Sequence, residues 1–440
     1  MADSDTLAAS SRRGPIRFAR DWARATFLSL RVRNYRLFFI GQAISLTGTW
    51  MQGVAQSWLV LKLTNSGAAL GVVVALQFLP VLLIAPYGGV LADRFSKRRL
   101  LLITQSSAGV LALALGALVA TETIRLWMVF VFAAMLGIVN SIDNPTRQSF
   151  VHELVGAETL RNAVTLNSLE VNLSRVIGPA VAGVLIAKAG VAPCFIINGL
   201  SYFAVIVCLW RMTGSELHRT ALVTAAKGQI REGFAYVRRN PLILEVLAMM
   251  AIVGTFTYEF QVTLPLLAKF TFHGDASTYA TLQSATGVGA VVGGLMTAGR
   301  RRATVGGLTV AALGFGVTAI GVSLSPTILV AGVGMIVVGV FSVMFTSMTN
   351  TILQIESAPT MRGRVMSLWT VAFLGSTLVG APIIGWIGEN IDPRWSIAAG
   401  GAAALVAAGV GLHALRSGRH TTLPESPIDE PSMTEKEDRA

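Results

Sequence analysis

Long apolar segments alternate with short polar connections along almost the whole chain. Each apolar segment has about 20 residues or more, which is the length a helix needs to cross the hydrocarbon core of a bilayer. The pattern therefore predicts twelve membrane-spanning helices. They cover residues 35–62, 67–91, 100–120, 125–144, 162–187, 193–211, 242–267, 277–298, 304–324, 327–351, 365–388 and 395–415.

The longest polar connection divides the predicted helices into two sets of six. We expect a six-helix half at 34–212, a central cytoplasmic loop at 213–241 and a second six-helix half at 242–416. Residues 1–33 form a polar, basic tail, and residues 417–440 form an acidic tail that we expect to be disordered. Within the central loop, the basic segment from Gln229 to Arg239 predicts a helix along the inner membrane face.

The composition and the distribution of charge agree with a membrane protein. Hydrophobic residues make up 53% of the chain and charged residues 13%, about half the charged share of a soluble domain. The net charge of +12 comes from Lys and Arg in alternate connections, as the positive-inside rule describes. This asymmetry places both termini in the cytoplasm, and it accounts for the basic balance without a nucleic-acid partner.

The two halves resemble diverged copies of one another. Three residue types recur at a spacing of 203 positions, each time between an inner loop and the helix that follows it. The matched pairs are Glu153 and Glu356, Arg161 and Arg364, and Pro179 and Pro382. Such a repeat indicates duplicated halves related by an axis along the membrane normal.

The connection between the second and third predicted helices carries the most specific motif. From Gly88 to Arg99 the sequence reads G-G-V-L-A-D-R-F-S-K-R-R. It resembles the signature G-x-L-A-D-R-x-G-R-R of the major facilitator superfamily, with Ser96 in place of the usual glycine. The resemblance implies an all-α membrane protein with twelve transmembrane helices in two pseudo-symmetric six-helix halves, acting as a secondary transporter.

The same resemblance implies a conformational latch that stabilises the outward-open state. Lys97 or Arg98 is expected to face Asp143 at the end of the fourth helix, and Arg364 to stand near Asp93. The residues of this predicted latch are Gly89, Asp93, Arg94, Lys97, Arg98, Asp143 and Arg364. The alternative is an ordinary basic inner loop, for which the acidic Asp93 is unnecessary.

A second motif lies in the fifth helix, where Gly178, Pro179 and Gly183 resemble the Gly-Pro motif of antiporters in this superfamily. Ala182 replaces one expected glycine, and residues 380–385 of the eleventh helix echo the pattern. Proline kinks a helix and small residues allow close packing, so simple helix packing is an equal alternative.

Three further segments make the chain similar to the enterobactin-exporter-like and macrolide-efflux-like branch of drug:proton antiporters. They are N-Y-R-L-F at 34–38, N-P-T-R-Q at 144–148 and M-R-G-R-V-M-S at 361–367. The intramembrane arginine that many drug antiporters carry in the fourth helix is absent from the predicted span.

Charges inside a membrane are costly and are usually functional. Glu259 is the predicted proton carrier, and Glu170 and Arg175 are further candidates for proton coupling. The alternative for Glu259 is a permanent salt bridge or hydrogen bond that shapes the bundle. Arg175 either binds an anionic group of a substrate or pairs with an acid elsewhere. Glu245 lies nearer the inner interface and is expected to be a solvated or paired end charge.

A stripe of uncharged polar residues on the first helix predicts one wall of a central cavity, with interhelical hydrogen bonding as the alternative. Aromatic residues of the seventh and tenth helices add candidates, although core packing is the stronger expectation for most of the tenth-helix residues. The predicted cavity residues are Gln42, Ser45, Thr49, Gln52, Gln56, Tyr258, Phe341 and Phe345.

No nucleophile motif, metal-ligand spacing or nucleotide-binding loop is present in the sequence, so we expect neither an enzyme nor a cofactor. Transport must then draw on an ion or substrate gradient. We predict a monomeric, multi-pass protein of the plasma (inner) membrane that exports an amphipathic small molecule, such as a drug or siderophore, in exchange for protons. The alternatives are an importer or facilitator of a polar metabolite, and a lipid-handling or assembly protein.

Overall fold

The structure, a computed structural model, describes residues 27–218, 229–298 and 303–418, which form helices joined by short turns and contain no strand. Every predicted span coincides with a helix, with part of a long helix, or with consecutive helical segments. Ten helical segments are long and apolar enough to cross a membrane. The two remaining predicted spans, in α3 (Arg33–Thr64) and α11 (Ala276–Ala298), are also helical but contain more polar residues.

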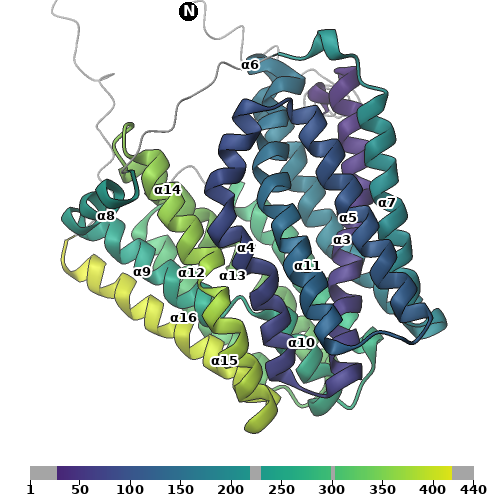
Figure 1. The fold of residues 1–440 in the computed structure, drawn as a ribbon. Coiled ribbons are helices and arrows are strands. Elements are labelled where there is room, and N and C mark those ends of the chain that lie inside the picture. The colour runs from purple at the N-terminus through teal and green to yellow at the C-terminus, as the bar shows by residue number, and fades with distance from the viewer. Residues whose placement is uncertain (1–26, 219–228, 299–302, 419–440) are drawn as a thin grey trace, which may run out of the picture.

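The N-terminal half consists of α3 and the four long helices that follow it (Figure 1). The further bounds are η1 (Leu28–Arg31), α4 (Gly67–Arg94), α5 (Lys97–Ala120), α6 (Leu126–Ala189), α7 (Ala192–Trp210) and η2 (Gly214–Glu216). One short 3-10 turn precedes α3, and another follows α7.

The C-terminal half follows a helix that matches the predicted helix of the central loop, α8 (Gln229–Arg239). Two of its six spans are each divided into three segments. The bounds are α9 (Pro241–Phe256), α10 (Phe260–Leu266), η3 (Leu267–Thr271), α11, α12 (Val305–Ser323), α13 (Ile328–Glu356), α14 (Arg362–Thr370), η4 (Val371–Gly375), α15 (Thr377–Asn390) and α16 (Pro393–Arg416).

Helix α6 contains both the fourth and the fifth predicted spans. The chain turns between them at Gly156, whose φ of 66° is a conformation that glycine adopts without strain. The fourth helix therefore continues to Gly156, well beyond its predicted end at residue 144. Hydropathy marks only the apolar part of a helix, and the residues after Asn144 are more polar. Consequently Arg147 lies inside the fourth helix, three residues beyond the end of the predicted span.

The predicted seventh span is not one continuous helix. α9 ends at Phe256, and α10 begins after Glu259, whose backbone has φ −78° and ψ 40°. The eleventh span contains the π-helical segment η4 between α14 and α15. The two interruptions lie side by side, because a Cβ atom added at Gly254 would come within 2.8 Å of the carbonyl oxygen of Ala372. π-Helical turns often occur at functional sites.

The two halves contact each other through small residues on two pairs of helices. On α6 and α11, a Cβ atom at Gly287 would lie 2.8 Å from the carbonyl oxygen of Arg175, and one at Gly183 would lie 2.8 Å from Cβ of Ala280. Between the same helices, the hydroxyl of Ser284 donates a hydrogen bond to the carbonyl oxygen of Val176 at 3.1 Å. These contacts bring the two backbones together.

The second pair, α4 and α15, follows the same principle: Gly67 and Gly71 pack against the backbone of α15 around Ala381 and Gly385. The predicted fifth-helix motif and its echo in the eleventh helix thus both lie at helix contacts. Gly178 has a different neighbour, since a Cβ atom there would lie 2.5 Å from Cβ of Trp50 in the same half. Pro179 follows it inside α6.

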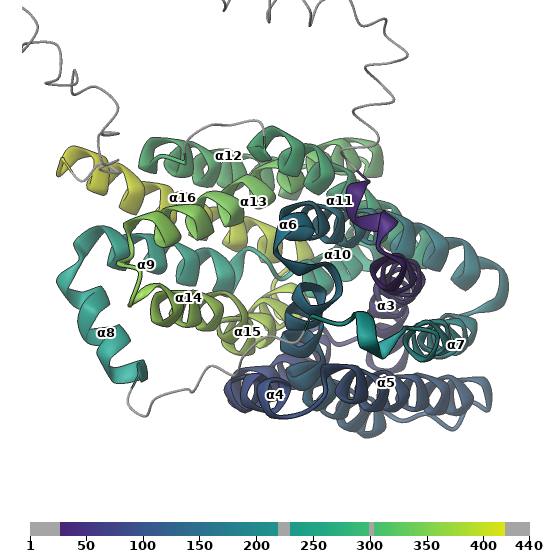
Figure 2. The same cartoon turned by 90° about the horizontal axis from the view of Figure 1, so that it is seen from above.

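The helices of the two halves lean apart toward the end of the bundle that carries α8, which we call the α8 end (Figure 1). Seen from that end, α8 lies at the margin of the C-terminal half, beside α9 and α14 (Figure 2). At the opposite end, α3 and α4 meet α10, η3 and α15. The bundle is therefore held together most closely at the end opposite α8.

Candidate functional site

A cavity of about 340 Å³ lies between the two halves and is lined by residues of both. A volume of this size is typical of small-molecule sites. The lining residues are Trp50, Val74, Phe78, Asn172, Arg175, Tyr258, Glu259, Phe260, Gln261, Gln283, Thr286, Ser342, Val343, Thr346, Trp369, Phe373, Leu374 and Thr377.

Glu259 lies in this cavity at the break between α9 and α10. Its backbone carbonyl accepts hydrogen bonds from the amides of Val262 and Thr263, which begin α10. The side chain is only 2% exposed, and its Oε1 atom has no hydrogen-bond partner among the described residues. No basic side chain of the described chain lies within ion-pair distance of it, so a permanent salt bridge is not what holds this carboxylate. A buried oxygen atom of this kind needs a partner from water or from a bound molecule.

Arg175 lines the same cavity from α6. Its guanidinium carbon lies 4.9 Å from the centre of the Trp50 ring, and its buried Nε atom has no hydrogen-bond partner. No acid of the described residues is within ion-pair distance, so the alternative of a paired arginine is not met in this structure. A stacked guanidinium with a free donor can bind an oxygen atom of a ligand.

A group of aromatic rings surrounds the break before α10. The Tyr258 ring lies 5.2 Å from that of Phe373 and 5.4 Å from that of Phe315, in edge-to-face geometry. The Tyr258 hydroxyl donates to the carbonyl oxygen of Ser342 at 2.6 Å, which fixes the ring. Trp369 stacks on Phe373 at 5.5 Å. Tyr258 was predicted from the sequence, whereas Trp369 and Phe373 were not, although their spacing of four residues puts these two on one helical face.

A second cavity of about 120 Å³ adjoins the first and is lined mainly by residues of the N-terminal half. Thr49, Gln52 and Gln56 of the predicted polar stripe line it, and the side-chain amide of Asn198 donates to Oε1 of Gln52 at 2.7 Å. Gln42 and Ser45 belong to the same stripe and are buried, but they line neither cavity. The stripe thus reaches the cavity only along its second half.

The two tenth-helix residues predicted for the cavity, Phe341 and Phe345, pack inside the C-terminal half instead. Phe345 is fully buried in the core of the C-terminal half, and Phe341 packs against Gly314 of α12. Neither lines the two cavities. Helical spacing alone does not distinguish the face of α13 that meets the cavity from the face that meets α12.

Glu170 is also outside the cavities. It is 5% exposed, and its Oε1 atom has no hydrogen-bond partner among the described residues. Its electrostatic neighbours are Tyr35 and Arg147, both in the N-terminal half. Of the three residues predicted for proton coupling, the structure therefore brings only Glu259 and Arg175 together.

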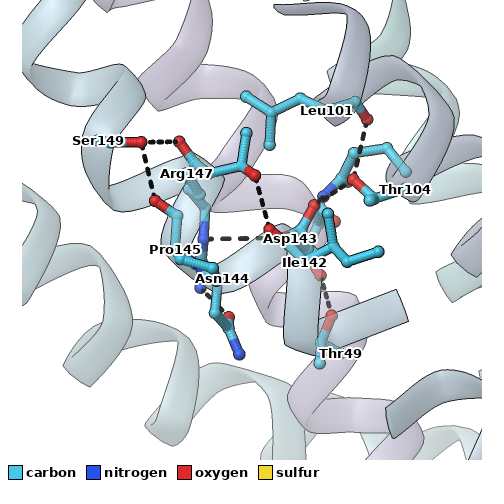
Figure 3. Close-up of polar contacts among 12 residues, drawn as sticks. Thr49, Leu101, Thr104, Ile142, Asp143, Asn144, Pro145, Arg147 and Ser149 are labelled. Carbon is cyan, nitrogen blue, oxygen red and sulfur yellow. Dashed lines mark hydrogen bonds and ion pairs between the residues drawn. The ribbon is translucent and has the colours of Figure 1, made fainter. Parts of the chain in front are cut away.

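Asp143 forms a polar cluster inside the N-terminal half (Figure 3). Its Oδ1 atom accepts hydrogen bonds from Thr104 at 2.6 Å and from Gln105 at 2.9 Å. Its Oδ2 atom lies 4.0 Å from Nε of Arg147, one helical turn further along α6. Asp143 therefore has partners on α5 and α6.

The expectation that Lys97 or Arg98 faces Asp143 was wrong. Lys97 forms an ion pair with Glu153 at 2.6 Å, and Arg98 donates to the carbonyl oxygen of Trp210 at 3.0 Å. The error follows from the underestimated length of the fourth helix, because Glu153 rather than Asp143 lies near its actual end.

Arg364, which the latch prediction places near Asp93, has a partner on α8 in this structure. Arg364 forms an ion pair with Glu232 of α8 at 2.8 Å. Arg94 is the exposed last residue of α4. Gly89 and Asp93 lie within α4, but the surroundings of these two residues are outside what the structure describes.

At the end opposite α8, side chains join the two halves directly, and we call these contacts the gate. The ammonium group of Lys269 donates to the carbonyl oxygen of Leu61 at 2.9 Å and to Oδ1 of Asn65 at 2.6 Å. Oε2 of Glu389 accepts from the hydroxyl of Ser66 at 2.6 Å and from the amide of Ala68 at 2.9 Å. The gate therefore stabilises closure of this end.

Two six-helix halves around a polar cavity, closed at one end, define a transporter of the major facilitator type. A family model described as transmembrane secretion effector matches residues 24–439. The chain belongs to this family of multi-pass membrane proteins.

Relatives of known name are also transporters. The enterobactin exporter of Citrobacter koseri is 26% identical over 371 residues, covering 83% of this chain and 88% of the relative. The staphyloferrin A transporter of Staphylococcus aureus is 31% identical over 176 residues, covering 40% of this chain and 44% of the relative.

Solved transporter structures share the fold. A bacterial homologue of the human lysosomal transporter Spinster, solved in an inward-facing and occupied conformation, superposes with a TM-score of 0.70 at 16% identity. The match covers 90% of this chain and 99% of that structure. It establishes the major facilitator architecture.

The Lys97–Glu153 pair yields a stability prediction. Lys97→Met leaves a buried carboxylate without its partner, which costs about 3–5 kcal/mol. We expect a lower melting temperature of the purified protein, measured by thermal unfolding in detergent. Adding Glu153→Leu should recover most of the loss. Arg98→Met, beside the pair but outside it, is the control; equal losses for both single variants would contradict the assignment.

The gate yields a conformational prediction. Lys269→Met combined with Glu389→Ala removes four hydrogen bonds between the halves, each contributing about 1 kcal/mol. We expect a longer distance between spin labels at Thr123 and Pro326, measured by electron–electron double resonance after both cysteines are replaced by serine.

Lys62→Met, at an exposed lysine of the same end, should leave this distance distribution unchanged. An unchanged distribution in the double gate variant would show that the gate does not stabilise the closed end.

Proposed function

We propose that this protein is a secondary transporter that exports an amphipathic small molecule, such as a siderophore, a drug or a similar metabolite, in exchange for protons. The observation that carries the proposal is the cavity between the two halves, which contains a buried carboxylate with an unpartnered oxygen atom. The named relatives, an enterobactin exporter and a staphyloferrin A transporter, support a siderophore-like cargo.

In this proposal the α8 end faces the cytoplasm, since the basic connections of the sequence gather there. The described state is then closed toward the outside by the gate and opens inward. Alternating access requires the halves to rock about the contacts of α4 with α15 and of α6 with α11. In the opposite state, Arg364 leaves Glu232 and approaches Asp93, which closes the inner side.

Glu259 is the proposed proton carrier. Its position between two helix segments lets a small change at residues 257–259 move the carboxylate without unwinding a complete helix. The unpartnered Oε1 atom accepts either a proton or a hydrogen bond from the cargo. A protonated carboxyl group is a weaker acceptor than a carboxylate, so proton entry weakens the hydrogen bond to the cargo and favours its release.

The first test is a mass-spectrometric comparison of cells and medium with and without this protein. Export predicts a compound that is retained in cells lacking the protein and depleted from their medium. The reverse distribution would establish the alternative of an importer and overturn the direction proposed here. A change confined to membrane lipids would instead support a lipid-handling role.

A second test replaces the carboxylate. Glu259→Gln keeps the size and polarity of the side chain but carries no titratable proton, so we expect loss of proton-driven export to the level of cells lacking the protein. Transport is measured in proteoliposomes with an imposed pH gradient, using the compound identified above. Glu245→Gln, in the same span but outside the cavity, is the matched control. Full proton-driven transport by Glu259→Gln would refute the carrier assignment.

A further inference from the structure

The two cavities adjoin each other, because Trp50, Val74 and Gln261 line both of them. Their chemistry differs sharply. We call the larger cavity the aromatic chamber and the smaller one the amide branch. A molecule that occupies both must therefore have two unlike parts.

The aromatic chamber presents ring faces and edges from several helices. Tyr258, Phe260, Trp369 and Phe373 line it, and neighbouring rings within this group are 5.2–6.2 Å apart. Rings at such separations favour a further aromatic group in offset or edge-to-face contact. This wall selects an aromatic part of the ligand.

Among the residues that the structure describes, the amide branch is lined by polar side chains and by no charged one. Its polar lining residues are Thr49, Gln52, Gln56, Ser57, Gln77, Asn198, Tyr202 and Gln261. Such side chains offer both donors and acceptors without attracting net charge. The branch therefore fits the amide, carbonyl or hydroxyl groups of an uncharged chain.

Arg175 lies where the chamber joins the branch, because its guanidinium stacks on Trp50, which borders both. Its unpartnered Nε donor can bind an oxygen atom of the ligand at this junction. Glu259 in the same chamber carries the opposite charge when ionised, and these two are the charged side chains of the described lining. The chamber as a whole thus favours a ligand without a large net charge.

We propose that the cargo is an aromatic compound of little net charge, with a carbonyl oxygen next to the ring and an uncharged polar chain. This inference rests on the proposed function. The ring binds among Trp369 and Phe373, the oxygen atom accepts from Arg175, and the chain enters the amide branch. An anionic aromatic acid shares most of this chemistry, and the experiment separates the two.

The experiment uses the full chain, purified into lipid nanodiscs, and measures binding by titration calorimetry at pH 7.5. The main probe is benzoylglycylglycinamide, which has the ring, the carbonyl group and the uncharged chain. Acetylglycylglycinamide lacks the ring, benzamide lacks the chain, and benzoylglycylglycine ends in a carboxylate. We expect the main probe to bind most tightly, with each truncated probe about 10-fold weaker or more.

Matched variants locate each part of the ligand. Gln56→Leu should abolish the advantage of the main probe over benzamide, whereas Gln42→Leu, on the same stripe of α3 but outside the branch, should preserve it. Trp369→Leu should abolish the advantage of the main probe over acetylglycylglycinamide, with Trp386→Leu, at an exposed tryptophan, as its control.

Arg175→Gln should weaken binding of the main probe about 10-fold. If that variant does not fold, Arg175→Lys, which loses the planar fork, replaces it.

Tighter binding of the carboxylate probe would overturn the inference in favour of an anionic cargo. Equal binding of all four probes, or no binding of any, would overturn it entirely. Because binding is measured without a gradient, these results are independent of transport. Loss of proton-driven export with normal probe binding would refute the proposed coupling and leave the ligand class standing.

Discussion

The constraint on which this structure depends is that lipid offers no hydrogen bonds to a peptide group. It makes every described span a helix and confines irregular backbone to places where protein or an aqueous cavity replaces the missing partners. The break at residues 257–259 is such a place. The side-chain hydroxyl of Thr257 donates a hydrogen bond to the carbonyl oxygen of Gly400, and the hydroxyl of Tyr258 donates one to the carbonyl oxygen of Ser342. The interruption that carries Glu259 is therefore stabilised by neighbouring helices.

The same constraint explains why both discontinuous helices border the cavity between the halves, because irregular backbone at membrane depth is tolerated beside a cavity or buried in protein. Both interruptions belong to the C-terminal half and pack against each other through Gly254, while α3, α4 and α6 supply the facing wall. The N-terminal half contributes the polar stripe and Arg175, and the C-terminal half contributes the aromatic rings and the carboxylate. The binding chemistry is thus divided between the two bodies that must move during transport.

Much of the fold could be predicted from the sequence, because apolar length reports directly on membrane crossing. Apolar length predicted twelve helical segments, ten of which are long and apolar enough to cross a membrane in the described part of the chain. The helix at residues 229–239 was predicted from its run of basic residues. Hydropathy failed where a helix continues into polar residues, as at Arg147 and Glu153, and where backbone breaks within an apolar run, as before Phe260. Glu259 could be singled out because a charged residue is conspicuous within an apolar span. Trp369 could not, because an aromatic residue is ordinary there and only tertiary packing decides whether it lines the cavity.

The small-residue contacts between the halves have a consequence for how such a protein diversifies. The contacts about which the halves rock in the proposed cycle are built from backbone and small residues, whereas the side chains that line the cavity lie elsewhere. Mutations that reshape the walls therefore leave the moving parts unaltered. One mechanical framework can acquire new cargoes by substitution at a few cavity positions, so specificity can evolve faster than the machinery that performs the movement.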